Sequence, residues 1–348
     1  MFKTIPAPAP FNHPEADVVL RSSDKEPVDF RVFKLFLSLS SPFFSDIFTL
    51  PQPPPSLPGS PYAGETLSLS PRIRDHKIPV IQMSEDSETL QLFLGLCFPI
   101  SVHPQRTTFT SLPQLQKVAE AALKFEMTSI LTYLRSSSGL LSPHFLESQP
   151  LRVFAIAYRY GWDLEARQAA RYTLRHSNPM SGSFVAELEF ISAATFFHLQ
   201  EYHRLCGEVA KSRVMLQPAL AESDDCWTWI TCRRCVGNSN GTSLVYSLFN
   251  RSNFPDVRKW WVQWIDEVSK EVKAKPWGET VRKWDSMNRA VERAQACSYC
   301  GPRARQDLEA YAQMLAVDIE KDVSSVSLLS NVNQTAETID LLTRWTWI

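Results

Sequence analysis

Cys232-Arg-Arg-Cys235 and Cys297-Ser-Tyr-Cys300 are two Cys-x-x-Cys motifs in the last third of a 348-residue chain. A motif of this form holds two sulfur atoms close enough to bind one metal ion, and two motifs supply the four thiolates of a structural zinc site. Metal binding at such a site contributes to folding. We therefore predict that Cys232, Cys235, Cys297 and Cys300 bind one zinc ion, which clamps the C-terminal part of the chain.

Two other interpretations of these cysteines stay open. Pairs of free thiols, partly buried among apolar side chains, are common in proteins. A redox-active pair of the thioredoxin type requires the motif at a strand–helix junction. The chain has 7 cysteines, an odd number, which fits a reducing compartment better than a framework of disulfides.

The two motifs lie in a Trp-rich region, 223–320, that is predicted to be helical. Residues 256–272 carry apolar side chains at i, i+3, i+4 and i+7 spacing, which predicts an amphipathic helix. Further helices are predicted over 279–296 and 308–319, followed by a tail over 321–348. The helices over 256–272 and 279–296 are expected to form a hairpin whose ends bring the two cysteine pairs together.

Several tryptophans lie on the apolar stripes of these helices. Trp260, Trp261 and Trp264 occur at helical spacing among valines and isoleucines, which favours core packing over a ligand platform or a partner hot spot. Trp261 is expected to be the most exposed of the three because it lies off the centre of its stripe. Trp284 is expected to face the core.

The preceding region, 143–222, is predicted to be entirely helical. Gly161 is a typical helix stop, because glycine adopts the left-handed conformation that ends many helices. The predicted helices cover 151–160, 163–176, 184–190 and 192–214.

An α+β domain is predicted over 15–140, after a Pro-rich flexible arm over 1–14. The Pro-rich stretch 50–76 cannot hold a helix or a central strand, and it is interpreted as a loop inserted within the domain. The predicted elements are strands over 17–20, 27–33 and 78–83, two short helices of which the second begins at Ser41-Pro42, and longer helices over 85–97 and 113–134.

The same N-terminal residues resemble the BTB/POZ family. The resemblance rests on Asp17-Val-Val-Leu20, on Phe30-Arg-Val-Phe-Lys34 and above all on Leu39-Ser-Ser-Pro-Phe-Phe-Ser-Asp-Ile-Phe48, in the order in which the family has them. It implies a small sheet flanked by helices, which serves homodimerisation and the docking of other proteins.

Two later stretches narrow the resemblance. Residues 151–162 and 202–206 are similar to BTB-domain proteins that are abundant in mushroom-forming fungi, a group that also carries paired cysteines near its C-terminus. The expected architecture is therefore α+β: an N-terminal BTB/POZ domain followed by an all-α region with a four-cysteine zinc clamp.

The composition excludes several classes of function. The net charge is −1, with 44% hydrophobic and 21% charged residues, so no global field attracts nucleic acid or acidic lipid. Signal-peptide features and apolar runs of membrane-spanning length are not expected. No Gly-x-Ser-x-Gly, His-Glu-x-x-His or Walker motif occurs. These features predict a non-enzymatic protein of the cytoplasm or nucleus.

The expected function is protein–protein interaction, as a dimerising adaptor or scaffold with an unknown protein partner. Phe33 and Phe36 are candidate partner-binding residues, since exposed apolar side chains on the first helices serve association. A cullin-type ubiquitin ligase adaptor is one alternative, because Met83-Ser-Glu85 has the hydrophobic-x-Glu form of some BTB adaptors that meet a cullin scaffold.

The other alternative is a zinc-containing transcriptional regulator that binds DNA. Its phosphate contacts would come from basic residues near the first cysteine pair. Acidic residues are interleaved with them, which makes nucleic acid an unexpected partner. The basic residues are Arg233, Arg234, Arg251, Arg258 and Lys259.

Overall fold

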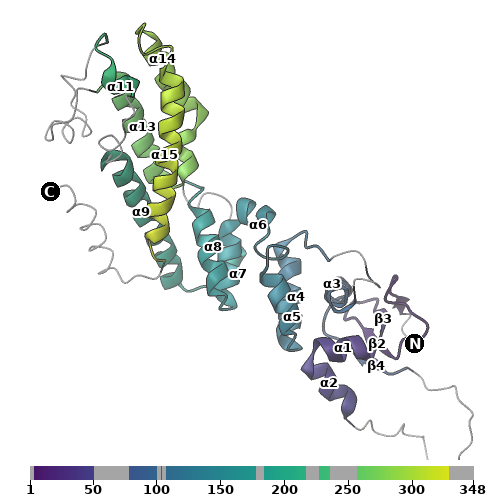
Figure 1. Ribbon diagram of the computed structural model, residues 1–348. Coiled ribbons are helices and arrows are strands. Elements are labelled where there is room, and N and C mark those ends of the chain that lie inside the picture. The colour runs from purple at the N-terminus through teal and green to yellow at the C-terminus, as the bar shows by residue number, and fades with distance from the viewer. Residues whose placement is uncertain are drawn as a thin grey trace, which may run out of the picture. The chain divides into compact units, whose positions relative to one another are not determined.

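A computed structural model describes residues 4–50, 78–99, 103, 107–177, 184–216, 227–235 and 257–328 (Figure 1). It divides the chain into two compact units, Met1–Phe145 and Leu146–Ile348. The described residues are mostly helical with one small sheet, so the predicted α+β class is confirmed. The Pro-rich insertion from 51 onward and the tail beyond 328 lie outside the described residues.

Four described strands form the sheet of the N-terminal unit, in the order β1-β3-β2-β4. The predicted hairpin is confirmed, because β2 and β3 are antiparallel with Val18 opposite Val32. The central strand β2 is buried along its apolar residues, as expected for a strand covered on both faces. The bounds are β1 Ile5–Pro6, β2 Val18–Arg21, β3 Val28–Val32 and β4 Val80–Gln82.

The prediction of a flexible arm over 1–14 is wrong for residues 4–14. The N–H of Ile5 donates to the residue before β3 at 2.9 Å and the N–H of Ala7 donates to β3 at 3.0 Å, on either side of a proline that has no N–H. Phe11 is buried, with its ring 5.1 Å from that of Phe98. One strand pairing and one buried aromatic ring attach this segment to the domain.

Five helices of the N-terminal unit accompany the sheet in the described residues. Ser41 joins the first two to the core, because its Oγ accepts from Phe44 N at 3.1 Å and donates to Phe125 O at 2.6 Å. Pro42 follows it at the first position of a helix, where its missing N–H costs nothing. The bounds are α1 Lys34–Ser40, α2 Pro42–Thr49, α3 Ser87–Cys97, α4 Leu112–Lys124 and α5 Thr128–Arg135.

The single helix predicted over 113–134 is two helices. Glu126 has a φ of 54°, in the left-handed region that ends helices. The N–H of Met127 donates back to Ala122 O at 2.8 Å. This break places the buried Phe125 ring 4.9 Å from that of Phe44, so tertiary packing interrupts a helical pattern that is continuous in the sequence.

The described part of the C-terminal unit is helical, as predicted. Gly161 has a φ of 68° and follows the first long helix. The elements are α7 Pro150–Arg159, α8 Asp163–Thr173, the 3-10 helix η1 Ala186–Phe190, α9 Ala193–Leu216, α11 Thr228–Thr231, α13 Lys259–Ala274, the 3-10 helix η2 Gly278–Arg282, α14 Trp284–Gln295 and α15 Ala304–Ser325, with α6 Pro143–Ser148 at the boundary between the units.

The long helices α9, α13, α14 and α15 pack side by side (Figure 1). The crossing of α9 and α13 is close, since a Cβ added to Gly207 would lie 2.3 Å from Lys273 O. Within the described residues, no helix combines the length and the apolar character needed to cross a membrane.

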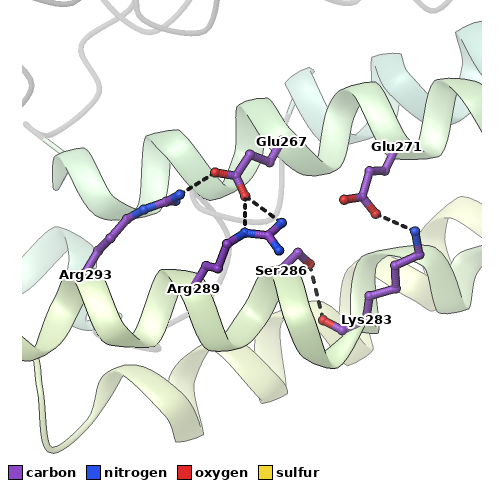
Figure 2. Close-up of polar contacts among 6 residues, drawn as sticks. All are labelled: Glu267, Glu271, Lys283, Ser286, Arg289 and Arg293. Carbon is purple, nitrogen blue, oxygen red and sulfur yellow. Dashed lines mark hydrogen bonds and ion pairs between the residues drawn. The ribbon is translucent and has the colours of Figure 1, made fainter.

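The predicted hairpin of α13 and α14 is confirmed, and ion pairs fix its antiparallel register (Figure 2). Glu267 of α13 lies 2.6 Å from Arg293 and 3.2 Å from Arg289, both of α14. Glu271, one turn further along α13, lies 2.7 Å from Lys283, which precedes α14. These pairs are partly exposed, so each adds about 0.2–1 kcal/mol and mainly selects the register.

Three details of the helical predictions are wrong. The helix predicted over 279–296 is interrupted after η2, which changes the phase of the stripe and leaves Trp284 67% exposed at the start of α14. The last helix is longer than predicted and runs to Ser325, beyond the predicted start of the tail at 321. Trp261 is fully buried rather than the most exposed of its group.

Candidate metal centre

The first cysteine pair follows directly on α11. Cys232 ends this short helix, and its N–H donates to Thr228 O at 3.1 Å. Thr228 is bound in turn by Asp307 of α15: its N–H donates to the carboxylate at 2.9 Å and its hydroxyl donates to the same oxygen. Asp307 therefore fixes α11, and with it Cys232, against α15.

The second cysteine pair lies in the connection between α14 and α15. The N–H of Cys297 donates to Ala294 O at 3.0 Å, and the N–H of Gly301 donates to Cys297 O at 2.9 Å. The carbonyl of Cys300 accepts from Ala304 N, the first residue of α15, at 2.8 Å. The two sulfurs are thus held by the turn that joins two packed helices.

All four sulfur atoms lie within 4.8 Å of one another. The Sγ–Sγ distances are 3.4 Å for Cys232–Cys235, 3.7 Å for Cys232–Cys297 and 3.5 Å for Cys235–Cys300. A tetrahedral ion with metal–sulfur bonds of about 2.3 Å separates its sulfurs by about 3.8 Å. The two motifs are therefore brought together as predicted, in a donor set compatible with a metal ion.

The cluster is largely closed to solvent. Cys232 and Cys300 are fully buried and Cys297 is 8% exposed, while Cys235 is half-buried. A structural metal site has this character, because the protein supplies all ligands and leaves no position for water or substrate.

The four thiols differ in how readily they lose a proton. Burial raises the pKa of Cys235 to about 11 and raises that of Cys300 as well. Burial also opposes ionisation of Cys232, but hydrogen bonds from the backbone N–H groups of Cys235 and Arg234 outweigh it and lower the pKa of Cys232 to about 6. Since a metal binds thiolates, occupation of this site releases protons.

Arg258, considered in the sequence as a phosphate contact, is instead a buried neighbour of the cysteine cluster. Arg258 is 7% exposed, and its Nη1 donates to Cys235 O at 2.9 Å. A guanidinium in this place offsets part of the charge of −2 that four thiolates and a divalent ion carry together. Arg258 immediately precedes α13. Nothing else in the sequence indicates that it lies beside the first cysteine pair.

Aromatic rings form a layer next to the metal centre. Trp227 stacks on Trp229 and Trp229 on Trp261, with ring centroids 5.1 and 5.5 Å apart. Tyr311 of α15 meets Trp229 edge-on at 5.4 Å. The predicted core role of Trp260, Trp261 and Trp264 is confirmed, since all three are buried.

The candidate partner-binding residues of the N-terminal unit are less exposed than expected. Phe33 and Phe36 are half-buried and contact each other with ring centroids 5.6 Å apart, while Phe36 also contacts Phe98 at 5.1 Å. The exposed apolar residues of α1 are instead Leu35 and Leu39, at 62% and 76%. They lie four residues apart on one helical face, a spacing that the sequence contains.

The hydrophobic-x-Glu segment lies against the core. Met83 is 5% exposed, and its N–H donates to Arg21 O of β2 at 2.8 Å. Glu85 accepts a hydrogen bond from Lys124 Nζ at 2.9 Å. An apolar anchor for a cullin scaffold is therefore not offered by Met83 in this arrangement.

The basic residues considered for phosphate contact differ in exposure. Arg233, Arg234 and Lys259 are exposed, whereas Arg258 is buried beside the cysteines. Arg251 lies outside the described residues. Of the described basic residues, Arg258 therefore contacts the cysteine cluster and is not available to a phosphate group.

Comparison with known proteins identifies no relative of this chain: no family model, no curated protein and no solved structure matches it. Functional conclusions therefore rest on the fold of the two units, on the cysteine cluster and on the distribution of exposed apolar and charged side chains.

Proposed function

We propose that the protein is a non-catalytic protein-interaction module whose C-terminal unit is held together by a structural zinc ion. The arrangement of the four sulfurs carries this proposal. Catalytic zinc keeps one coordination position open for water or substrate, whereas Cys232, Cys235, Cys297 and Cys300 would fill all four positions. Zinc bound in this way contributes to the folding of the helical unit and takes part in no reaction.

The N-terminal unit is proposed to be a BTB/POZ domain that pairs with a second copy of the chain. The sequence of elements, a hairpin, two short helices, a third strand and further helices around a small sheet, supports this assignment. Leu35 and Leu39 support the pairing, because together they expose an apolar strip on α1. Burial of an exposed leucine stabilises an interface by about 1.5–3 kcal/mol.

Elemental analysis of the full-length protein, purified without added metal, tests the zinc proposal. We expect one zinc ion per chain, and we expect Cys232→Ser to lose the metal and to lower the stability of the C-terminal unit. Cys97→Ser is the matched control, since Cys97 lies in α3 outside the cluster and donates to Phe93 O at 3.4 Å, a bond that serine retains. Full-length protein without metal, or Cys232→Ser with unchanged metal and melting, would contradict the proposal.

A further inference from the structure

A cleft of about 380 Å³ opens in the C-terminal unit, away from the cysteine cluster. One wall consists of Arg171 and Tyr172 of α8 and of Arg175, which follows this helix, and the others are Trp277 and the end of α15 with Glu320. This volume is at the lower end of ligand pockets, which span about 300–1,000 Å³. The cleft therefore suits a single side chain or a small ion rather than a nucleic acid strand.

Arg175 is held in this cleft by aromatic rings. Its guanidinium carbon lies 4.0 Å from the ring centroid of Tyr172 and 5.0 Å from that of Trp277. Stacking of this kind fixes the guanidinium plane and leaves its N–H edge to bind an oxyanion in a bidentate manner. The ion pair of Arg175 with Glu147 is long, at 3.7 Å, and Glu147 is 64% exposed, so this carboxylate is a weak and displaceable partner.

A second cation, Lys275, lies near the same Trp277 ring as Arg175. Lys275 Nζ lies 5.4 Å from the Trp277 ring, and the pKa of Lys275 is lowered by burial and by the charges of Lys283 and Arg175. The pKa of His176 is lowered by burial and by the charge of Lys275. Arg175 and Lys275, both near the Trp277 ring, thus repel each other, and an anion bound by Arg175 would reduce this repulsion.

The remaining charges of the cleft are already paired. Arg171 lies 3.0 Å from Glu320, and Glu320 also accepts the N–H of Gly278 at 2.9 Å. Glu320 is therefore engaged in holding η2 to α15 and does not neutralise Arg175. Arg175 in the cleft, with Lys275 next to the lining residues Pro276 and Trp277 and with one loosely held carboxylate, matches a dianion better than a single carboxylate.

We propose that this cleft binds a phosphate monoester on a phosphorylated side chain of a partner protein. Arg175 would contact the phosphoryl oxygens through its N–H edge, and Lys275 would supply the second positive charge. A phosphorylated side chain carries a charge of about −1.5 to −2 at pH 7, and clusters of basic residues recognise such groups in other proteins. The inference deepens the proposed function, because it assigns a chemistry to the partner that the module captures.

Ligand-observed ³¹P NMR on the full-length protein tests this site, with N-acetyl-O-phosphotyrosine amide, N-acetyl-O-phosphoserine amide and inorganic phosphate as separate probes. We expect the ³¹P signal of a phosphoamino acid to broaden when the protein is added. We expect Arg175→Gln to weaken its binding at least tenfold and Arg175→Lys to weaken it less. Arg282→Gln is the control, because Arg282 is an arginine paired with Glu279 outside this cleft, and it should bind as the wild type does.

Each outcome decides a separate point. Binding of inorganic phosphate alone would overturn the side-chain source of the ligand, and binding that survives Arg175→Gln with unchanged circular dichroism would overturn the site. No broadening of any probe would overturn the inference altogether. Zinc content and molar mass, measured on the same samples, test the proposed function independently. A failure of the phosphate site can therefore be distinguished from a failure of the proposed function.

Discussion

Trp229 and Trp261 stack face to face, with ring centroids 5.5 Å apart and ring planes 10° apart. Trp229 lies in α11, three residues before Cys232, whereas Trp261 belongs to α13. The stack therefore joins the segment of the first cysteine pair to the helical bundle. Aromatic rings thus add to the attachments of this segment through the sulfur cluster and through the hydrogen bonds of Thr228 with Asp307.

Removal of the stack should destabilise the C-terminal unit. Trp229 is fully buried, so Trp229→Ala leaves a large cavity, and we expect a loss of about 3–5 kcal/mol in the free energy of unfolding, measured by urea denaturation. Trp284→Ala is the matched control, because Trp284 is 67% exposed and its truncation should change stability by less than about 0.5 kcal/mol. Equal effects of the two substitutions would refute the assignment of Trp229 to the core.

Gly207→Ala should lower stability although alanine favours helices. An added Cβ would lie 2.3 Å from Lys273 O, and the backbone of α13 must shift to admit it. We expect a loss of about 1–3 kcal/mol from overpacking, against a gain of about 1 kcal/mol that glycine replacement brings in an open helix. Gln200→Ala at an exposed site of the same helix provides the comparison, and a Gly207→Ala protein as stable as this control would show that α9 and α13 are not in close contact.

Leu39→Glu should convert a dimer into a monomer. Leu39 is 76% exposed on α1, and a carboxylate there would be desolvated without a partner in an apolar interface. Light scattering coupled to size-exclusion chromatography should report the mass of two chains for the wild type and of one chain for the variant. Leu164→Glu serves as control, since Leu164 is 71% exposed on α8. A wild type that elutes with the mass of a single chain at micromolar concentration would argue against pairing through α1.

His203 should make stability fall as the solution becomes acidic. Its pKa is lowered from the ordinary 6.5 by burial, against a hydrogen bond with His176 O. The unfolded chain then binds a proton below pH 6.5 that the folded chain does not, so the free energy of unfolding decreases as the pH falls through this range. Urea unfolding at pH 7.5 and 5.5 measures the slope. His203→Gln should reduce it, whereas Gln200→Ala at an exposed, uncharged site of the same helix should leave it unaltered.

Local patterns in the sequence account for the cysteine cluster and for most helices. The Cys-x-x-Cys spacing by itself holds two sulfurs close together. The apolar stripe of α13 indicates a buried face. The hairpin of α13 and α14 closes the long gap between the pairs, so the metal-centre geometry follows from short-range signals combined with one helical pairing.

Long-range contacts explain what the sequence did not reveal. Trp261 is buried because Trp229 covers it from a different segment, which the periodicity of α13 cannot show. The helix break near Phe125 is accompanied by a hydrogen bond from Ser41 Oγ to Phe125 O and by the contact with Phe44, and these residues are far apart in the chain. Arg258 was grouped with phosphate-binding residues because its charge is visible in the sequence and its burial is not.

The position of the second cysteine pair, after the whole α13–α14 hairpin, has a consequence for synthesis of the protein. A ribosome-bound chain that ends before Cys297 offers only two of the four sulfurs, and the complete donor set exists only once Cys300 has emerged and the two helices have paired. At the proposed site, capture of an ion by all four sulfurs would therefore follow the pairing of α13 and α14. An ion held by all four sulfurs would thus fasten a hairpin that has already formed and would not initiate it.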